Sequence, residues 1–150
     1  MRIETGYFIW SKGERTKLSE YFSTQEFDCQ CNYDSCIEQR ISQDLINKLT
    51  LVRIENKSPL HITSGFRCGK HQQDLRNQLN SGKKSLTVVA NKTSQHELGN
   101  AADISPRIGT IAKLRKVVET LFDSIGLAKT FLHVDTRLKK QDGSKRIWNY

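Results

Sequence analysis

The sequence predicts an α+β fold, in a single domain that spans residues 1–150. Helical and strand-like patterns follow one another without a regular βαβ rhythm, which favours this class over a parallel α/β sheet. The length of 150 residues suits one hydrophobic core. Neither an internal repeat nor a linker divides the chain, so we expect one domain.

The first two expected elements lie before residue 60. Residues 17–27, KLSEYFSTQEF, read as a loop or short helix whose aromatic side chains pack on the body of the protein: Tyr21, Phe22 and Phe27. A helix follows from Ser42 to about Glu55, because Ser42 can cap its start. Its apolar residues recur at helical spacing: Leu45, Ile46, Leu49 and Val52. Pro59 ends this helix.

The middle of the chain contains a strand, a helix and a second strand-like run. Residues 60–64, LHITS, alternate and are rich in β-branched side chains, which is typical of a strand. Residues 70–80, KHQQDLRNQLN, have a second helical pattern, which ends at Ser81 and Gly82. Residues 86–90, LTVVA, form another short strand-like run. A polar turn follows it.

The last third of the chain is expected to contain three strands and one helix. Residues 101–105, AADIS, are a candidate buried strand. A helix is expected over residues 107–125, because six apolar residues trace one stripe that Gly126 closes: Ile108, Ile111, Leu114, Val118, Leu121 and Ile125. Residues 131–137, FLHVDTR, alternate again, and residues 146–150, RIWNY, form a last strand.

The formal net charge of +8 predicts a surface that favours anionic partners. The chain has no helix-turn-helix, zinc-finger or aromatic RNA-binding signature, so we expect no specific nucleic-acid partner. The densest basic cluster, RLKKQDGSKR at residues 137–146, is typical of a solvated loop. No apolar run reaches the roughly 20 residues of a membrane span, and the start MRIETGYFIW lacks a signal-peptide pattern. Synthesis in the cytoplasm is expected.

The chain has four cysteines, three of which follow a C-x-C-x4-C pattern in residues 29–36, CQCNYDSC. Disulfides are disfavoured in a chain without a signal peptide. One alternative is a second, structural zinc ion held by four thiolates, although the spacing is not the usual C-x2-C. The other is a set of reduced, partly buried thiols. Both alternatives concern the same residues: Cys29, Cys31, Cys36 and Cys68.

Residues 93–105, TSQHELGNAADIS, place His96 and Asp103 seven positions apart around Gly99. On one straight helix this separation is about 10.5 Å, whereas each ligand atom of a zinc ion lies about 2 Å from the metal. Two ligands of one ion therefore require a bend, and Gly99 gives the backbone that freedom. On spacing alone, a histidine near an aspartate more often has a structural role than binds a metal. We expect such a structural role for His61 and His71.

Residues 131–135, FLHVD, place Leu132 and Val134 on one side of a strand, and His133 and Asp135 on the other. The aliphatic pair belongs to the core, which leaves the histidine and the carboxylate on an open face. Two histidines and one aspartate would give three zinc ligands and leave the fourth position for water, as in a catalytic zinc site: His96, Asp103 and His133.

Three motifs resemble those of the zinc D-alanyl-D-alanine carboxypeptidase family, which includes phage L-alanyl-D-glutamate endopeptidases. Residues 94–103, SQHELGNAAD, are similar to its S-x-H-x-x-G-x-A-x-D motif. FLHVD resembles its C-terminal histidine motif, and residues 62–67, ITSGFR, resemble its S-G-[YF]-R segment. FSTQEFDCQC and RIWNY are similar to members from bacteria and phages. The resemblance runs from about Leu18 to the C-terminus.

The resemblance implies a role for each matching residue. Its zinc ligands correspond to His96, Asp103 and His133. Arg67 matches an arginine that meets a substrate carboxylate or the polarised carbonyl oxygen, and a planar guanidinium suits both tasks. Ser94 and Gln95 match residues that line the substrate cleft. The implied fold is a small central antiparallel sheet with helices packed around it, as in the hedgehog and D,D-peptidase superfamily.

One position departs from the family pattern. Many members carry a glutamate or aspartate, the general base, three residues before the last zinc histidine, and this chain has Thr130 there. Asp135 is the expected replacement, because residues i and i+2 of a strand share a face with side chains roughly 6–7 Å apart. Glu97 is a weaker candidate. The alternative is that Asp135 pairs with Arg137 or orients a ligand.

The resemblance therefore implies a zinc peptidase that cleaves peptidoglycan stem peptides, as a D-Ala-D-Ala carboxypeptidase or an L-Ala-D-Glu endopeptidase. We expect a monomer that is either a bacterial cell-wall hydrolase or a phage enzyme that reaches the cell wall through lysis or as part of a virion. Anionic wall polymers would attract its positive surface. The alternative is a catalytically inactive zinc-binding module of the same fold. The hedgehog signalling domain resembles this family and shows that the scaffold can serve binding.

Overall fold

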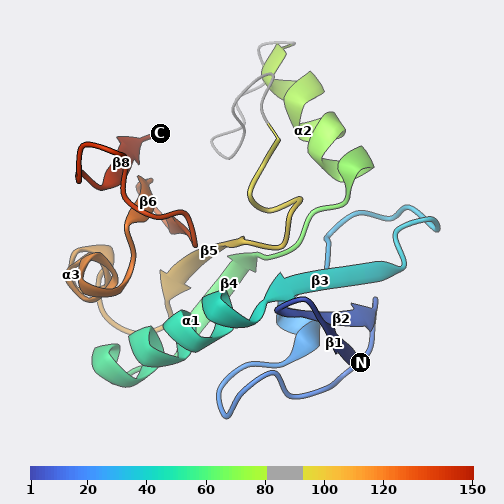
Figure 1. Ribbon diagram of the computed structural model, residues 1–150, viewed down its shortest axis with the longest axis horizontal. Helices are drawn as coiled ribbons and strands as arrows, with labels where there is room; N and C mark the ends of the chain where they lie inside the picture. Colours follow the sequence, from blue (N-terminus) through green and yellow to red (C-terminus); the bar gives the residue numbers. More distant parts are fainter. Residues whose placement is uncertain (81–92) are drawn as a thin grey trace.

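The computed structural model describes residues 1–80 and 93–150, and within these ranges it is a mixed α+β structure with two sheets (Figure 1). The expected strand at residues 86–90 lies outside the described residues. The helices are α1 (Gln43–Asn56), α2 (Gly69–Asn80) and α3 (Ile111–Leu121), with a short 3-10 helix η1 (Thr24–Phe27) before them. None of the described helices is long and apolar enough to cross a membrane.

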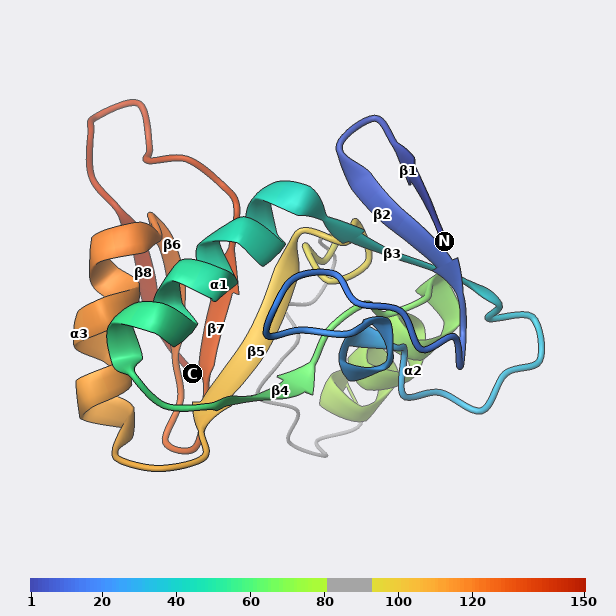
Figure 2. The ribbon, with the colours of Figure 1, turned by 90° about the horizontal axis from the view of Figure 1, so that it is seen from below.

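The smaller sheet comes from the N-terminal part of the chain and was not expected from the sequence. Its strands are β1 (Arg2–Glu4), β2 (Tyr7–Ser11) and β3 (Glu38–Ser42), all antiparallel. Ser42 ends β3 and also caps α1, since its hydroxyl accepts a hydrogen bond from the Leu45 backbone N–H at 3.3 Å. The predicted cap is therefore confirmed, and the small sheet leads directly into the first long helix (Figure 2).

The larger sheet has the strand order β4-β5-β7-β6-β8. Its members are β4 (Leu60–Ser64), β5 (Ala101–Pro106), β6 (Ser124–Leu127), β7 (Leu132–Asp135) and β8 (Arg146–Asn149). All neighbours are antiparallel except β6 and β8, which are parallel, so the expectation of a wholly antiparallel sheet is wrong at this pair. The reason is that β5 occupies the other edge of β7. The chain that returns after β7 therefore pairs with the free edge of β6. It runs opposite to β7, as β6 does, and is therefore parallel to β6.

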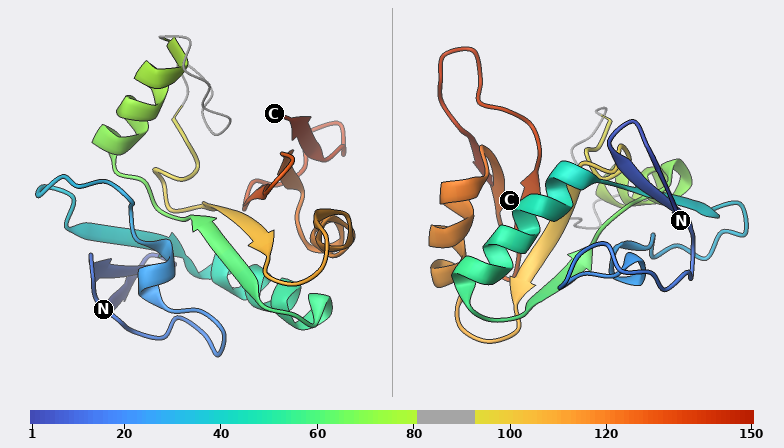
Figure 3. Two further views of the ribbon diagram at one scale, coloured as in Figure 1. Left: turned by 180° about the vertical axis from the view of Figure 1, so that it is seen from behind. Right: turned by 60° about the horizontal axis from the view of Figure 1, so that its bottom comes forward.

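Helices α1 and α3 cover one face of the larger sheet and enclose the main core (Figures 2 and 3). Ala102 and Ile104 of β5 and Leu132 and Val134 of β7 point into this core and are almost completely buried. The alternation of a strand then places Asp103 and His133 on the opposite face. Helix α2 extends away from α1 and α3 (Figure 1).

The expected helix over residues 107–125 is too long by a turn at each end. Thr110 caps α3 by accepting the Lys113 backbone N–H at 3.1 Å, and Ile108 before it is exposed. At the other end, Ile125 lies in β6, where it pairs with Val134. Helical spacing cannot separate an apolar residue that continues a helix from one that begins the next buried strand.

Candidate metal centre

The register of the larger sheet brings the aspartate of one motif to the histidine of the other. Asp103 of β5 lies directly opposite His133 of β7 in an antiparallel pair, and Ala101 lies opposite Asp135. Side chains of directly opposed residues lie on the same face of the sheet, about 4.5–5.5 Å apart at Cβ. Two segments thirty residues apart in the chain thus share one site. All four residues of β7 are buried, so the expected open face is covered in the structure.

His96 reaches the same place from the turn that precedes β5. Gly99 in this turn has a φ of +77°, and a Cβ there would lie 2.9 Å from the Arg40 carbonyl oxygen. Both facts require glycine. The Gly99 carbonyl accepts the Ser42 backbone N–H at 2.8 Å, which fixes the turn to the start of α1. The expected bend between His96 and Asp103 is therefore present.

Three side-chain atoms converge on one point of this buried face. His96 Nε2 lies 3.2 Å from Asp103 Oδ1 and 3.2 Å from His133 Nδ1, and the latter two atoms are 3.1 Å apart. A tetrahedral zinc ion with ligands at 2.0–2.1 Å needs them about 3.3–3.4 Å from one another. The donor set and its spacing suit a zinc ion. Each of the three residues is at most 6% exposed.

The outer hydrogen bonds decide which atoms face the centre. His96 Nδ1 lies 2.7 Å from the Gly65 carbonyl oxygen, which can only accept, so Nδ1 carries the proton and Nε2 presents a lone pair. In the same way His133 Nε2 donates to Asp135 Oδ2 at 2.8 Å, which leaves the lone pair of Nδ1 inward. With both imidazoles neutral, three lone pairs face one another, and only a proton or a cation between them relieves their repulsion.

The ionisation of these residues follows from the same arrangement. Burial opposes the charge on Asp103, but His96 and His133 hold the pKa of its carboxyl far below the usual range. Burial lowers the pKa of His96. Burial also acts against charge on His133, yet its contacts with Asp103 and Asp135 raise its pKa above the ordinary value. The site therefore favours positive charge near the inner nitrogen of His133.

Asp135 lies behind His133, on the side away from the converging atoms. Besides His133, its carboxylate accepts from Arg137 Nε at 2.9 Å, Arg137 Nη2 at 2.9 Å and the Arg137 backbone N–H at 3.1 Å. Burial acts to raise the pKa of the Asp135 carboxyl, but hydrogen bonds from His133 and Arg137 outweigh it and hold this pKa well below its usual range. This geometry favours the alternative in which Asp135 pairs with Arg137 and orients a ligand over its expected role as the base.

Arg67 lies at the site, where its guanidinium bonds other side chains of the protein. Its guanidinium bonds Asp103 Oδ2 at 3.0 Å and Ser64 Oγ at 3.1 Å, and it is 3% exposed. Asp103 thus turns one oxygen to the histidines and the other to Arg67. A cavity of about 280 Å³ opens beside this pair, and Phe131 and His71 also line it. Arg67 is near enough to meet a ligand in this cavity while it orients Asp103.

The other residues predicted from the sequence do not contribute to the three converging atoms. Ser94 accepts the His96 backbone N–H at 3.2 Å, and the Gln95 carbonyl accepts that of Asn100 at 2.9 Å, so both shape the histidine turn. Glu97 lies near Arg76 of α2, with 3.9 Å between Oε2 and Nη2. His61 lies on β4 with its side chain exposed. The four expected thiols lie together as a separate cluster.

Two aromatic residues at the site were not expected from the sequence. The Trp148 ring contacts that of His133 at 5.3 Å between centroids, and Tyr150 lies 5.6 Å from Phe131. Both pack over Gly126, where a Cβ would come within 2.8 Å of each ring. RIWNY is correctly predicted as a strand, but only the parallel pairing of β8 with β6 places its rings beside the histidine.

The buried histidine–aspartate–histidine set could hold one divalent metal ion, which makes this α+β protein a candidate for the class of metalloproteins. Comparison with known families identifies which class this is. The sequence model of the family Peptidase M15 matches residues 20–135, and the chain belongs to this family, whose members are zinc-dependent peptidases. No curated protein and no solved structure matches the chain.

Proposed function

We propose that the protein is a zinc metallopeptidase that hydrolyses peptide bonds in the stem peptides of bacterial peptidoglycan. The main support for the metal site is that three buried ligand atoms, His96 Nε2, Asp103 Oδ1 and His133 Nδ1, lie 3.1–3.2 Å from one another. Family membership supports peptide hydrolysis. The substrate class rests on the resemblance of the motifs to zinc D-alanyl-D-alanine carboxypeptidases and phage endopeptidases. A net charge of +8 suits a chain that works among anionic wall polymers.

In this proposal His96, Asp103 and His133 hold the metal ion. Zinc bound there would polarise the scissile carbonyl and lower the pKa of a bound water molecule toward about 7. Gly65, Arg67 and Asp135 hold the outer atoms of the three ligands, which keeps their inner atoms in place before the metal arrives. In the adjoining cavity, the Arg67 guanidinium would fix a substrate carboxylate or carbonyl oxygen.

A second candidate is a zinc-binding module of the same fold that does not catalyse hydrolysis. Thr130 stands where many family members have the general base, and the carboxylate of Asp135 is already bonded to His133 and Arg137. Both observations leave the proton acceptor unassigned. The two candidates share the metal site and differ only in turnover.

Incubation of the zinc-loaded chain with purified peptidoglycan separates the two candidates. For the peptidase, new free amines appear, a chelator abolishes them and zinc restores them, and mass spectrometry of the released muropeptides identifies the bond. His133→Ala should lose the zinc ion of this histidine–aspartate site together with the activity. His61→Ala, which changes an exposed histidine on β4, is the matched control and should retain both. Zinc bound at these three ligands without hydrolysis supports the non-catalytic module, and a chain that binds no zinc at them refutes both.

A further inference from the structure

The second group of metal-ligating side chains lies outside the site described above. The sulfur atoms of four cysteines all lie within 4.8 Å of one another, and those of Cys31 and Cys68 are 3.7 Å apart. A tetrahedral zinc ion with sulfur ligands at about 2.3 Å needs them about 3.8 Å from one another. Several metal ions between the sulfurs, as in an iron–sulfur cluster, would need wider spacing. The cluster has the size of a site for one ion.

We propose that this cluster is a structural tetrathiolate zinc site. Its four ligands are Cys29, Cys31, Cys36 and Cys68. The inference rests on the cysteines alone and does not depend on the proposed peptidase function. The cysteines lack the C-x2-C pairs that are usual in zinc sites. Here the fold brings the fourth cysteine to the other three, so a short C-x2-C turn is not needed to assemble the site. Cys68 lies directly before α2, while the others come from the loop between η1 and β3.

The surroundings of the sulfurs are those of thiolate ligands. Cys29 Sγ accepts the Cys68 backbone N–H at 3.3 Å, and Cys68 Sγ accepts the His71 backbone N–H at 3.4 Å. Gln39 Nε2 lies 3.3 Å from Cys36 Sγ. Lys12 Nζ is 3.6 Å from Cys31 Sγ and offsets part of the negative charge that four thiolates around a divalent ion would carry. Outer contacts of this kind orient metal ligands.

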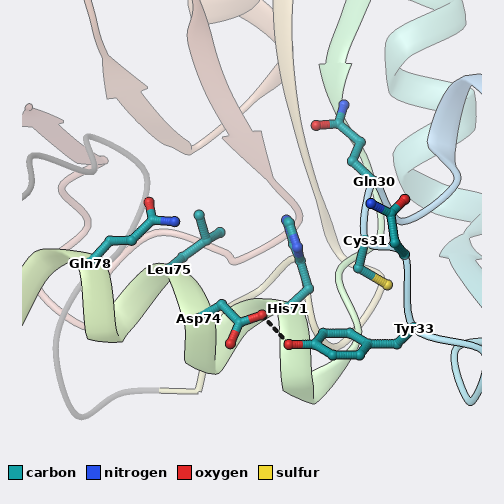
Figure 4. A pocket seen from close by; sticks show the side chains of 8 residues that line it. Gln30, Cys31, Tyr33, His71, Asp74, Leu75 and Gln78 are labelled. Carbon is teal, nitrogen blue, oxygen red and sulfur yellow. Dashed lines mark hydrogen bonds between the residues drawn. The ribbon is translucent and has the colours of Figure 1, made fainter.

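The cluster also has a path by which an ion can enter. Cys29, Cys31 and Cys36 are at most 9% exposed and pack with Phe66. Cys31 nevertheless lines a cavity of about 450 Å³ against α2, together with His71 and Tyr33 (Figure 4). The hydroxyl of Tyr33 donates to Asp74 across one side of this cavity. The site is therefore closed on the protein side and reachable from one face.

The position of the cluster gives the ion a structural role. The segment between β4 and α2 passes along the cluster, where the Phe66 backbone N–H bonds the Phe27 carbonyl at 2.9 Å. A Cβ on Gly65 would lie 2.5 Å from Phe27 Cα, so the two segments are in direct backbone contact. Gly65 and Arg67 of this segment bond His96 and Asp103 on its other side. A metal at the cysteines would hold the segment that orients two ligands of the first site.

Metal analysis of the whole chain, purified under reducing conditions, tests this site. We expect two zinc ions per chain in the unaltered protein and one in Cys36→Ser. The matched control is Ser35→Ala, which changes the exposed neighbour in the same loop and should retain both. A variant with both His96→Ala and His133→Ala should retain one ion, at the cysteines. Failure of the first site therefore leaves the test of the second intact.

Cobalt substitution gives a readout that does not require a variant to fold. Cobalt at four thiolates produces sulfur-to-metal charge-transfer absorption, which a site of two histidines and one aspartate lacks. We expect this absorption in the unaltered chain and in the double histidine variant. We also expect all four cysteines to resist alkylation until a chelator is added. Absence of the absorption, alkylation that a chelator does not change, or a disulfide between Cys31 and Cys68 in the purified chain would overturn the proposal.

Discussion

Replacement of Asp135 by asparagine tests how the metal ligands are held. Asp135 is completely buried, and its carboxylate accepts from His133 Nε2 at 2.8 Å and from Nε and Nη2 of Arg137 at 2.9 Å each. An asparagine amide has one oxygen and one NH2 group, so its NH2 must face a nitrogen donor of either His133 or Arg137. A buried donor without an acceptor costs about 1–3 kcal/mol.

The magnitude for metal binding follows from the role of such outer partners. Loss of the group that orients a metal-bound histidine typically weakens metal affinity about 10–100-fold, which corresponds to about 1.4–2.7 kcal/mol. We therefore expect Asp135→Asn to raise the zinc dissociation constant by this factor, measured by competition with a chromogenic chelator. Asp44→Asn, a change to an exposed carboxylate on α1, should leave zinc affinity unchanged.

The same variant separates the two roles of Asp135. A general base contributes about 10²–10⁴-fold to turnover, so its loss would reduce turnover at saturating zinc by that amount while zinc affinity stays constant. An orienting residue gives the opposite pattern, with weaker zinc binding and a smaller change in turnover once zinc is saturating. Unchanged zinc affinity in Asp135→Asn would refute our reasoning about the outer hydrogen bonds.

Three further predictions concern the same region. Arg67→Ala leaves Asp103 without its buried cationic partner. We expect this variant to be destabilised by about 3–5 kcal/mol in urea unfolding. Arg67→Lys, which keeps the charge, should recover part of this stability. The pKa of His133 is raised by Asp103 and Asp135, so a proton competes for its inner nitrogen already above the ordinary histidine pKa of about 6.5. Zinc affinity, measured by titration calorimetry, should therefore begin to fall above that pH as the pH is lowered, and affinity independent of pH would contradict this. Gly65→Ala forces a Cβ against the Phe27 backbone and should destabilise the chain by about 1–3 kcal/mol. Gly69→Ala is the control, because its Cβ would meet only the flexible end of the Glu97 side chain, at 3.2 Å.

Local patterns in the sequence predicted those elements that a single stretch of chain defines. The helix capped by Ser42 and the strands of residues 60–64 and 101–105 are confirmed, because capping and alternation act over a few residues. The end of α3 was wrong, because Ile125 is buried in a strand as thoroughly as it would be in a helix. Strands β1 to β3 were missed, although β1 and β2 form a local hairpin; only β3 pairs with a strand that lies far along the chain.

In the candidate site, too, the sequence predicted the residues within each motif but not their partners from elsewhere in the fold. Motif order and the bend at Gly99 identified His96, Asp103 and His133, and the structure brings them together. Their outer partners were not visible in the sequence, because a backbone carbonyl such as that of Gly65 has no residue signature. The role of Asp135 depends on which side of the His133 ring it occupies, and periodicity along a strand cannot specify this.

The pairing of β8 at the sheet edge determines how the chain can be extended for experiments. The backbone N–H of Tyr150 bonds the Leu127 carbonyl at 3.0 Å, and the ring lies close enough to Asp103 and Arg67 to respond to their charges. A purification tag fused after this residue would begin beside the metal ligands, and a histidine tag there would compete for zinc. At the opposite end, all three residues of β1 are exposed, so a tag before Met1 leaves the site undisturbed.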